Sequence, residues 1–387
     1  MPIPYGRQCI SSADINAVVE VLKSDFLTQG EAVPLFEKAV AQQCGAEFAV
    51  AVNSATSALH LACLALNLGP DDWVWTSPIS FVASANCARY CGANVDFVDI
   101  DPQTYNMSVA HLQLKLEQAE KLGNLPKIVI PVHLSGQVCE MKAIHDLGQK
   151  YGFNIIEDAS HAIGGKYQQQ PVGNCQFSDI TVFSFHPVKI ITTGEGGMAL
   201  TQDAQLYQRM MRLRSHGIVR NQEEMTHPPD GGWYYQQLEL GYNYRLTDIQ
   251  AALGLSQLQN LEAFVSRRHS LAQRYNQHLA KLPLRTPWQH PDSYSGQHLY
   301  IVRLNLDQVS VSHRAVYETL KAAGIGVNIH YIPIYSHPYY AQMGFQPTDF
   351  PESEQYYQEA LTLPLFPTLT ESEQDEVISQ LRKVLIR

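Results

Sequence analysis

A lysine just before a glycine-rich turn carries the most chemical information in this sequence of 387 residues. Lys189 follows the apolar run 180–185, which predicts a buried strand, and precedes three glycines within residues 194–197. A lysine amine that the backbone holds in a partly buried position loses its proton readily, and the neutral amine adds to an aldehyde to form a Schiff base. The segment therefore predicts covalent carbonyl chemistry, whereas a lysine before glycines without further support is an ordinary polar turn.

A carboxylate follows a second apolar run upstream. Residues 154–157 predict a strand, and Asp158 would lie at its carboxyl end, where open α/β sheets bind ligands. An enzyme that uses pyridoxal 5′-phosphate needs a lysine to hold the aldehyde and a carboxylate to keep the pyridine nitrogen protonated, so that the ring withdraws electrons. The pairing of Asp158 with Lys189, in that order along the chain, therefore favours a pyridoxal 5′-phosphate site.

Length and composition limit the other classes of function. A chain with 45% apolar residues can bury a large core and predicts two domains. The formal charge of 27 − 37 = −10, without a basic run, argues against nucleic acid and anionic membrane as partners. Residues 1–7 contain no signal-peptide pattern, and no later apolar run is long enough to cross a bilayer. We therefore expect a cytoplasmic enzyme.

The cysteines agree with that expectation. Seven cysteines without a Cys-x-x-Cys motif fit reduced thiols in a cytoplasmic protein. Cys87 and Cys91 are one helical turn apart, but no further His or Cys at ligand spacing completes a metal site. We therefore expect no metal.

Strand-like and helix-like segments alternate along the first half of the chain, which predicts an α/β fold with a mostly parallel sheet. The predicted strands are residues 48–52, 73–76, 95–98, 128–132, 154–157 and 180–184. The predicted helices are residues 56–66, 81–90, 110–121 and 141–151, together with a first helix that carries Ile15, Val18, Val19 and Leu22 behind Ser11 and Ser12.

The composition changes after residue 219. Residues 220–237 are polar and rich in turn formers but contain an aromatic cluster at 233–235, which predicts a hairpin that packs on another surface such as a second subunit. A long helical stretch broken once is predicted at 247–279, followed by a strand at 299–304 and helices at 312–323 and 372–385. We predict a large cofactor-binding domain over residues 1–255 and a smaller C-terminal α+β domain over 256–387.

Several side chains at predicted strand ends suit the same cofactor. Thr56 and Ser57 stand at a strand-to-helix junction, where free N–H groups and the helix dipole bind phosphate. Phe81 offers a ring for stacking on the pyridine, His161 could reach the 3-hydroxyl of the ring, and Ser184 adds a hydroxyl near the phosphate. Taken singly, these are an ordinary helix cap, a core phenylalanine and a structural histidine. Their common location favours contacts with the cofactor.

The sequence resembles the nucleotide-sugar aminotransferases of the DegT/DnrJ/EryC1/StrS family, and the resemblance extends from Tyr5 to the terminal helix. Ala55 and His161 stand where many members have Gly and Gln. The resemblance implies the aspartate aminotransferase-like fold of pyridoxal-phosphate enzymes, fold type I. It is carried by residues 53–59 (NSATSAL), 76–81 (TSPISF), 157–161 (EDASH), 184–189 (SFHPVK), 195–197 (EGG), 214–217 (RSHG) and 241–246 (GYNYRL).

The resemblance also implies roles in binding the cofactor. Lys189 would bind the aldehyde and move the proton during the reaction, and Asp158 would pair with the pyridine nitrogen. Phe81 would stack on the ring and His161 would contact its 3-hydroxyl. The phosphate would be held by Thr56, Ser57 and Ser184, with Asn243 supplied by the partner subunit of a homodimer with shared active sites.

A nucleotide sugar as amino acceptor and L-glutamate as amino donor follow from the same resemblance. It is strongest to the branch that acts in pseudaminic acid biosynthesis, on residues 27–30 (LTQG), 78–81 (PISF) and 328–335 (NIHYIPIY). That branch aminates C4 of UDP-2-acetamido-2,6-dideoxy-β-L-arabino-hexos-4-ulose and forms UDP-4-amino-4,6-dideoxy-N-acetyl-β-L-altrosamine. The sugar-nucleotide pocket would be lined by Tyr5, Phe26, Leu27, Thr28, Gln29, Asn328, Ile329, His330 and Tyr331.

Four alternative functions are weighed against this assignment. A related aminotransferase could act on another 4-keto or 3-keto sugar. A sugar 3-dehydratase of the same family would have His in place of the lysine, so Lys189 argues against it. A cofactor-binding regulator or inert scaffold would have little need for Lys189, Asp158 and a phosphate site. A nicotinamide oxidoreductase is disfavoured because no G-x-G-x-x-G follows the first predicted strand.

Overall fold

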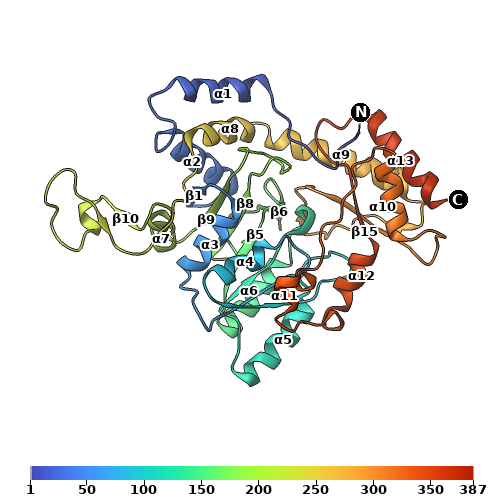
Figure 1. The fold of residues 1–387 in the computed structure, drawn as a ribbon, viewed down its shortest axis with the longest axis horizontal. Coiled ribbons are helices and arrows are strands. Elements are labelled where there is room, and N and C mark those ends of the chain that lie inside the picture. Colours follow the sequence, from blue (N-terminus) through green and yellow to red (C-terminus); the bar gives the residue numbers. More distant parts are fainter. Residues whose placement is uncertain (1, 387) are drawn as a thin grey trace.

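A seven-stranded mixed sheet forms the centre of the molecule (Figure 1). The computed structural model describes residues 2–386. The strand order is β1-β9-β8-β5-β4-β2-β3, and β9 runs antiparallel to its two neighbours while the other pairs are parallel. The predicted α/β class with a mostly parallel sheet is confirmed. The strands are β1 (Phe48–Val52), β2 (Trp73–Thr76), β3 (Asn94–Phe97), β4 (Ile128–Ile130), β5 (Asn154–Asp158), β8 (Ile180–Ser184) and β9 (Gly197–Thr201).

The antiparallel strand β9 has no counterpart in the strands predicted from the sequence. It begins at Gly197, inside the glycine cluster that suggested a turn. A Cβ atom added at Gly197 would lie 2.4 Å from the backbone nitrogen of Ala55. The strand and the following helix therefore approach too closely for any side chain at this position, which explains a glycine at the start of a buried strand.

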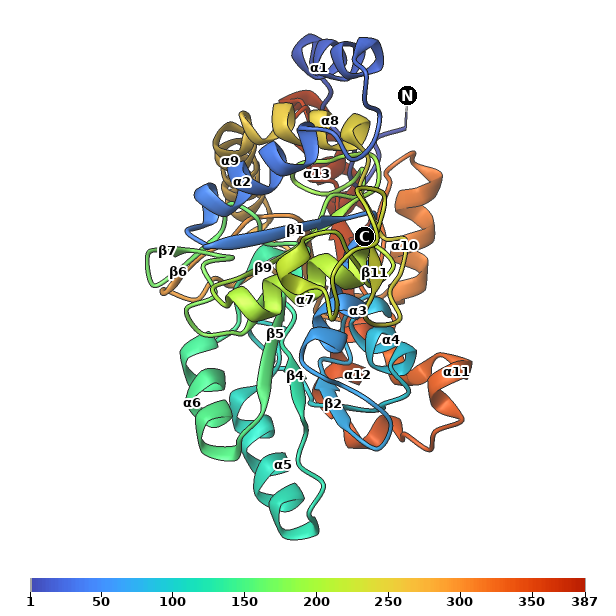
Figure 2. The same ribbon diagram turned by 90° about the vertical axis from the view of Figure 1, so that its left-hand side faces the viewer.

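Helices cover both faces of the sheet, as Figures 1 and 2 show. Because side chains alternate along a strand, Val50 and Val52 pack with α3, α4 and α7, whereas Ala49 and Ala51 pack with α2, α5, α6 and α8. The bounds are α2 (Ala32–Cys44), α3 (Ala55–Ala65), α4 (Ala83–Tyr90), α5 (Val109–Leu122), α6 (Met141–Tyr151), α7 (Ala204–Arg214) and α8 (Asp248–Leu258).

The first helix, α1 (Ser12–Lys23), lies across α8 at the edge of the molecule (Figure 1). Its predicted cap is confirmed, since Ser11 and Asp14 form a capping box. Its apolar face is not buried within the chain, because Ile15 is 56% and Leu22 is 54% exposed. An apolar helix face left open in one protomer is suited to covering by another surface.

A second core lies in the C-terminal part of the chain. Ile3 joins this core from the other end of the chain, through a parallel bridge to Ile325. Helix α9 contacts both cores, and the boundary between residues 255 and 256 remains a prediction. The elements of this part are α9 (Leu261–Leu279), β12 (Leu284–Arg285), β13 (Ser293–Tyr294), β14 (Tyr300–Leu304), α10 (His313–Ala322), α11 (Pro338–Ala341), α12 (Pro351–Glu359), β15 (Ala360–Leu363) and α13 (Glu371–Leu385). Strands β12, β14 and β15 form an antiparallel sheet.

The segment after α7 projects from the body of the molecule (Figure 1). A short antiparallel pair closes it, β10 (Ile218–Val219) with β11 (Gln236–Gln237), as the predicted hairpin required. Trp233, which lies between β10 and β11 in the sequence, is 76% exposed. A smaller sheet pairs β13 with β6 (Lys166–Tyr167) and β7 (Gln170–Pro171), and the 3-10 turns are η1 (Leu134–Gly136), η2 (Gln222–Glu224), η3 (Ile334–Ser336) and η4 (Pro347–Asp349). Within residues 2–386, no helix has the length and hydropathy needed to span a membrane.

Candidate active site

Lys189 lies in the loop that connects β8 to β9. Backbone hydrogen bonds close this loop, from Phe185 N–H to the Gly196 carbonyl at 2.9 Å and from Lys189 N–H to the His186 carbonyl at 2.9 Å. The side chain lines a cavity of about 600 Å³. Burial lowers the pKa of Lys189 to about 8, and the Asp158 carboxylate opposes this shift. About a tenth of the amine is therefore neutral, and nucleophilic, at pH 7.

Asp158 ends β5 and lines the same cavity. Its Oδ2 accepts a hydrogen bond from Ser84 Oγ at 2.6 Å, and its Oδ1 accepts from Ser160 Oγ at 2.6 Å and from Ser160 N–H at 3.2 Å. The residue is only 5% exposed, and no cation of the described chain forms an ion pair with it. A buried carboxylate that is oriented by hydroxyl groups but has no charged partner suits a cationic ligand group.

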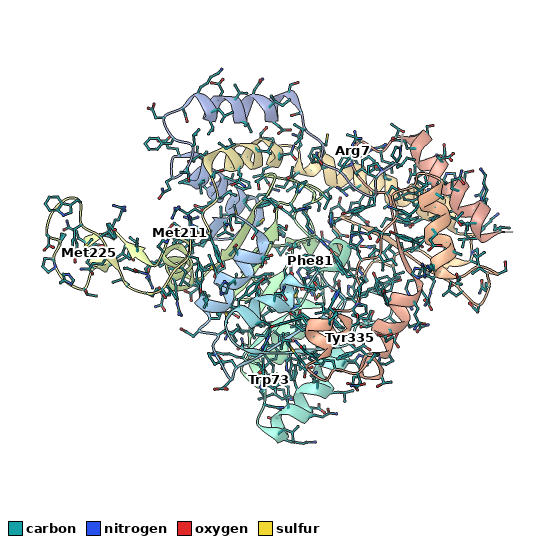
Figure 3. All side chains as sticks on the ribbon, viewed as in Figure 1. Arg7, Trp73, Phe81, Met211, Met225 and Tyr335 are labelled. Atoms are coloured by element: carbon teal, nitrogen blue, oxygen red, sulfur yellow. The ribbon has the colours of Figure 1, made fainter. Side chains whose placement is uncertain are left out.

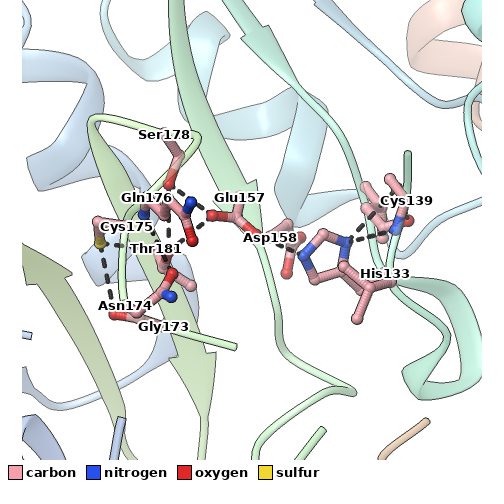
Figure 4. A network of polar contacts seen from close by, with 12 residues as sticks. His133, Cys139, Glu157, Asp158, Gly173, Asn174, Cys175, Gln176, Ser178 and Thr181 are labelled. Atoms are coloured by element: carbon pink, nitrogen blue, oxygen red, sulfur yellow. Dashed lines mark hydrogen bonds and ion pairs between the residues drawn. The ribbon is translucent and has the colours of Figure 1, made fainter. Parts of the chain in front are cut away.

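The preceding residue, Glu157, does not line this cavity, and its carboxylate lies in a network of polar contacts (Figure 4). Its carboxylate accepts hydrogen bonds from His133 Nε2 at 2.7 Å and from Thr181 Oγ1 at 3.1 Å. Burial alone would raise the pKa of Glu157, but the hydrogen bonds from His133, Ser178 and Thr181 lower it overall. Glu157 is thus satisfied within the fold and stabilises the strand that presents Asp158.

The N-terminus of α3 forms another part of the cavity wall. Ser54 caps this helix by accepting the Ser57 N–H at 3.1 Å. Ala55 and Thr56 line the cavity, as does Ser184 at the end of β8. Ser57 is turned away, since its hydroxyl donates to Asn53 Oδ1 at 2.7 Å. Free N–H groups of a first helical turn, with neighbouring hydroxyls, form a site for a phosphate group.

Aromatic and imidazole rings form another wall. Phe81 lies near the middle of the molecule (Figure 3), lines the cavity and is 59% exposed. Its ring centroid is 6.3 Å from that of Tyr331. His161 is buried, and its Nε2 lies 3.2 Å from the Tyr331 hydroxyl.

The segment 328–331 closes the cavity from the C-terminal part of the chain. Asn328 pairs with Thr362 of β15 through backbone hydrogen bonds of 3.3 and 2.8 Å. The His330 ring lies 5.3 Å from that of Tyr5, and its Nδ1 is 2.9 Å from Thr362 Oγ1. Burial and the charge of Lys189 lower the pKa of His330 to about 3, so this ring is neutral. Tyr5 and residues 328–331 thus line the cavity as a group.

The structure brings most of the residues predicted from the sequence together but separates five of them from Lys189 within one protomer. Phe26 and Leu27 are 61% and 47% exposed. Neither they nor Thr28 line the cavity, and Gln29 lines a different cavity beside Arg212, Arg214 and Arg245. Asn243 is exposed, and its backbone bridges to Ser215.

Two residues that orient Asp158 were not predicted. Ser160 carries a local signal, because an aspartate carboxylate commonly accepts a hydrogen bond from the backbone N–H two residues further on. Ser84 carries none, since it reaches Asp158 from helix α4, 74 positions away along the chain. The contact between Tyr331 and His161 spans 170 positions and has no sequence signal either.

Comparison with known proteins agrees with this geometry. The family model described as the DegT/DnrJ/EryC1/StrS aminotransferase family matches residues 8–382. The spore coat polysaccharide biosynthesis protein SpsC of Bacillus subtilis is 38% identical over 386 residues, which cover 99% of this chain and 97% of SpsC.

Solved structures give the same result. PseC of Helicobacter pylori, an aminotransferase involved in the biosynthesis of pseudaminic acid, superposes with a TM-score of 0.89 at 31% identity and covers 100% of this chain and 99% of its own. The Spr1654 protein of Streptococcus pneumoniae, solved in PLP and PMP forms, superposes with a TM-score of 0.88 at 30% identity, covering 99% of this chain and 98% of its own.

Proposed function

The chain belongs to the DegT/DnrJ/EryC1/StrS aminotransferase family and has the fold of the fold type I pyridoxal-phosphate aminotransferases, and from this premise we propose that it transfers an amino group from L-glutamate to C4 of a UDP-linked 4-keto-6-deoxy-N-acetylhexosamine. The observation that carries the proposal is the pair formed by Lys189 and Asp158. A lysine whose pKa is lowered to about 8 and a buried carboxylate without a charged partner face the same cavity.

The residues present fit pyridoxal 5′-phosphate. Asp158 suits a protonated pyridine nitrogen, and Lys189 suits an aldehyde. The N–H groups at the start of α3, with Thr56 and Ser184, suit the phosphate, and Phe81 suits the face of the ring. The Ser57 hydroxyl donates to Asn53 Oδ1 and the Ser57 N–H donates to Ser54 Oγ, so a contact between Ser57 and the phosphate would require one of these hydrogen bonds to be exchanged.

When bound, pyridoxal 5′-phosphate supplies an aldehyde that takes up the amino group and a ring that accepts electrons from the neighbouring carbon. Two residues of the chain would then act. Lys189 would take the proton from Cα of the amino donor and hold it for return, and its lowered pKa suits a base near neutral pH. Asp158 keeps the ring nitrogen charged. The same steps in reverse deliver the amino group to the keto sugar.

A nucleotide sugar as acceptor agrees with the roles of the relatives. PseC acts in the biosynthesis of pseudaminic acid, and SpsC acts in spore coat polysaccharide biosynthesis. Within the cavity, Tyr5 and residues 328–331 offer aromatic and amide groups that suit a sugar and a nucleotide. We propose the substrate of the pseudaminic acid branch, with UDP-4-amino-4,6-dideoxy-N-acetyl-β-L-altrosamine as product.

We further propose that the active sites are shared within a homodimer. Asn243 is exposed, and Phe26 and Leu27 present apolar surface. None of these residues lines the cavity of its own protomer. A second copy that covers this surface would bring Asn243 to the phosphate and residues 26–29 to the nucleotide sugar.

Incubation of the purified protein with pyridoxal phosphate, ¹⁵N-labelled L-glutamate and a panel of UDP-linked 4-keto sugars tests the proposal. The expected product is a ¹⁵N-amino sugar formed with an equal amount of 2-oxoglutarate, measured by mass spectrometry. Lys189→Ala should form none, while Lys142→Ala, which removes an exposed surface lysine, should match the wild type. A wild-type protein that aminates no keto sugar, or a Lys189→Ala variant that retains full turnover, would overturn the proposal.

A further inference from the structure

Helix α12 supports the cavity wall formed by residues 328–331 through a tyrosine hydroxyl. Tyr356 of this helix is fully buried, and its Oη donates a hydrogen bond to the His330 carbonyl at 2.6 Å. That carbonyl belongs to the peptide unit between His330 and Tyr331, which both line the cavity of Lys189. Tyr356 does not line the cavity, and its ring packs in the apolar core beneath the wall. The hydroxyl therefore acts on the wall from within the protein.

The Tyr356 ring has little freedom to move away from this carbonyl. Its centroid lies 4.9 Å from that of Tyr105, and the Arg303 guanidinium carbon lies 6.0 Å from the Tyr356 centroid. Arg303 is buried as well, and its Nε donates to Glu359 Oε2 at 2.9 Å. An aromatic neighbour and a cation at these distances both attract the ring. The hydroxyl is therefore presented to the His330 carbonyl by a fixed ring.

Tyr356 remains a hydrogen-bond donor throughout the neutral pH range. Burial, and then the neighbouring Tyr105, raise the pKa of Tyr356 well above its usual value, while Arg303 opposes this rise. The phenol therefore keeps its hydrogen. Among residues 2–386, it is the one donor to the His330 carbonyl. Replacement of Tyr356 by phenylalanine would keep the ring and leave this carbonyl without its hydrogen bond.

A second anchor holds the same segment from strand β15. Thr362 pairs with Asn328 through two backbone hydrogen bonds, and its Oγ1 lies 2.9 Å from His330 Nδ1. Thr362 is fully buried and does not line the cavity. The wall is thus fixed at the His330 side chain by Thr362 and at the His330 carbonyl by Tyr356. Because neither residue lines the cavity, both can act on a bound substrate only through the wall.

We propose that Tyr356 and Thr362 are positioning residues for the nucleotide sugar, which hold residues 328–331 so that the side chains of this segment bind the keto sugar in the cavity. The inference deepens the proposed function and rests on it for the identity of the substrate. Groups that suit the cofactor, such as Asp158 and Ser184, come from β5 and β8 instead. Loss of an anchor should therefore weaken the binding of the sugar and leave the reaction with L-glutamate unchanged.

The test compares Tyr356→Phe with Tyr300→Phe in the cofactor-loaded protein. Tyr300 is the matched control, because it is also fully buried and its hydroxyl donates to Asn276 Oδ1 of α9, outside the cavity. Each variant loses one buried O–H group and keeps its ring. Stopped-flow measurement of the visible band follows the reaction with L-glutamate alone, and steady-state kinetics give kcat and KM for the keto sugar that the wild type aminates. Thermal unfolding checks that each variant is folded.

Tyr356→Phe should raise the KM for the sugar about three- to tenfold, which is the change in an equilibrium constant that the loss of one buried hydrogen bond produces. The kcat should stay within about threefold, because the lost binding is common to the substrate and the transition state. The rate with L-glutamate should stay within about twofold of wild type. Tyr300→Phe should lower the unfolding temperature without changing the KM, as Tyr356→Phe would do if its role were only structural.

Thr362 provides an independent pair of variants, which decides the question if Tyr356→Phe does not fold. Thr362→Ser keeps a hydroxyl beside His330 Nδ1 and should resemble the wild type, whereas Thr362→Val removes it and should raise the KM for the sugar. A KM that is unchanged by either Tyr356→Phe or Thr362→Val, or an equal loss in the reaction with L-glutamate, would overturn the inference. A wild type that aminates no sugar of the panel would instead refute the proposed function, and the inference with it.

Discussion

Asp158 and Lys189 line one cavity without forming an ion pair: the carboxylate accepts its hydrogen bonds from Ser84 and Ser160, and the amine lies close enough for the carboxylate to oppose the fall in its pKa. A direct ion pair would keep the lysine charged and the carboxylate neutralised. The observed separation leaves the amine free to become a nucleophile and the carboxylate free to bind a cationic group.

We predict that Asp158→Asn folds but loses turnover by roughly two orders of magnitude or more, because an amide cannot hold the pyridine nitrogen in its charged form. The amide oxygen can still accept the hydrogen bonds of Ser160. Steady-state kinetics and thermal unfolding on the same preparations measure both effects. Asp179→Asn is the matched control. It removes a carboxylate that accepts a hydrogen bond from the Ile155 N–H in β5, away from the cavity. This variant should lower stability without a comparable loss of turnover. A rate within a few-fold of wild type would make Asp158 a structural residue.

The uptake of pyridoxal phosphate should depend on pH through Lys189. The pKa of this lysine is lowered to about 8, so the neutral, reactive fraction grows as the pH rises to that value and is complete above it. The rate of cofactor binding to the lysine should therefore rise about tenfold per unit below pH 8 and level off above it. Stopped-flow measurement of the visible band gives this profile. A rate that continues to rise toward pH 10 would show that the lysine is not perturbed, and Lys166→Ala should leave the profile unchanged.

Much of the sheet could be predicted because its strands are short apolar runs bounded by turn residues. The bounds of β1, β2 and β8 agree with the predicted strands. Strand β9 could not be predicted, because its first residue is a glycine that local rules assign to a turn, and the reason for the glycine is a contact with Ala55 on another element. The local sequence pattern predicts a strand correctly only where contacts with distant elements do not require a residue that is unusual for strands.

In the candidate site, too, some residues could be predicted from local sequence pattern and others depend on long-range packing. Lys189, Asp158 and Thr56 follow strands that the sequence reveals, so their common location follows from the rule that parallel strands end at one edge. Ser84 and the pairing of His161 with Tyr331 depend on how α4 and residues 328–331 fold back over that edge. The separation of residues 26–29 from the cavity likewise depends on tertiary structure. The Leu27 carbonyl accepts a hydrogen bond from the backbone N–H of Asp248 in α8.

Glu157 should stabilise the fold in a pH-dependent way without taking part in turnover. Its pKa is lowered in the folded protein, so its contribution to the free energy of unfolding is complete above pH 4.5 and is lost as the pH falls through the folded pKa. Glu157→Gln should lower the free energy of unfolding by about 1–3 kcal/mol at neutral pH. It should also flatten the decline of that free energy below pH 4.5. Urea titrations at several pH values measure this, and parallel curves for the two proteins would contradict the assignment.

The last prediction concerns Asn243 and the shared site. Asn243 is exposed and does not line the cavity of its own protomer, so a contact with the cofactor phosphate requires a second copy of the chain. Asn243→Ala should weaken phosphate binding, and Lys189→Ala should abolish turnover. If the two variants are mixed under conditions of subunit exchange, each heterodimer contains one site with both defects and one site with neither. Random exchange of equal amounts should then restore about a quarter of the wild-type activity.

Exchange is followed with differently tagged subunits. A mixture of Lys189→Ala with Lys189→Ala/Asn243→Ala, in which every site lacks the lysine, is the control and should stay inactive. If exchange occurs and activity does not rise above that of the separate variants, Asn243 serves its own subunit.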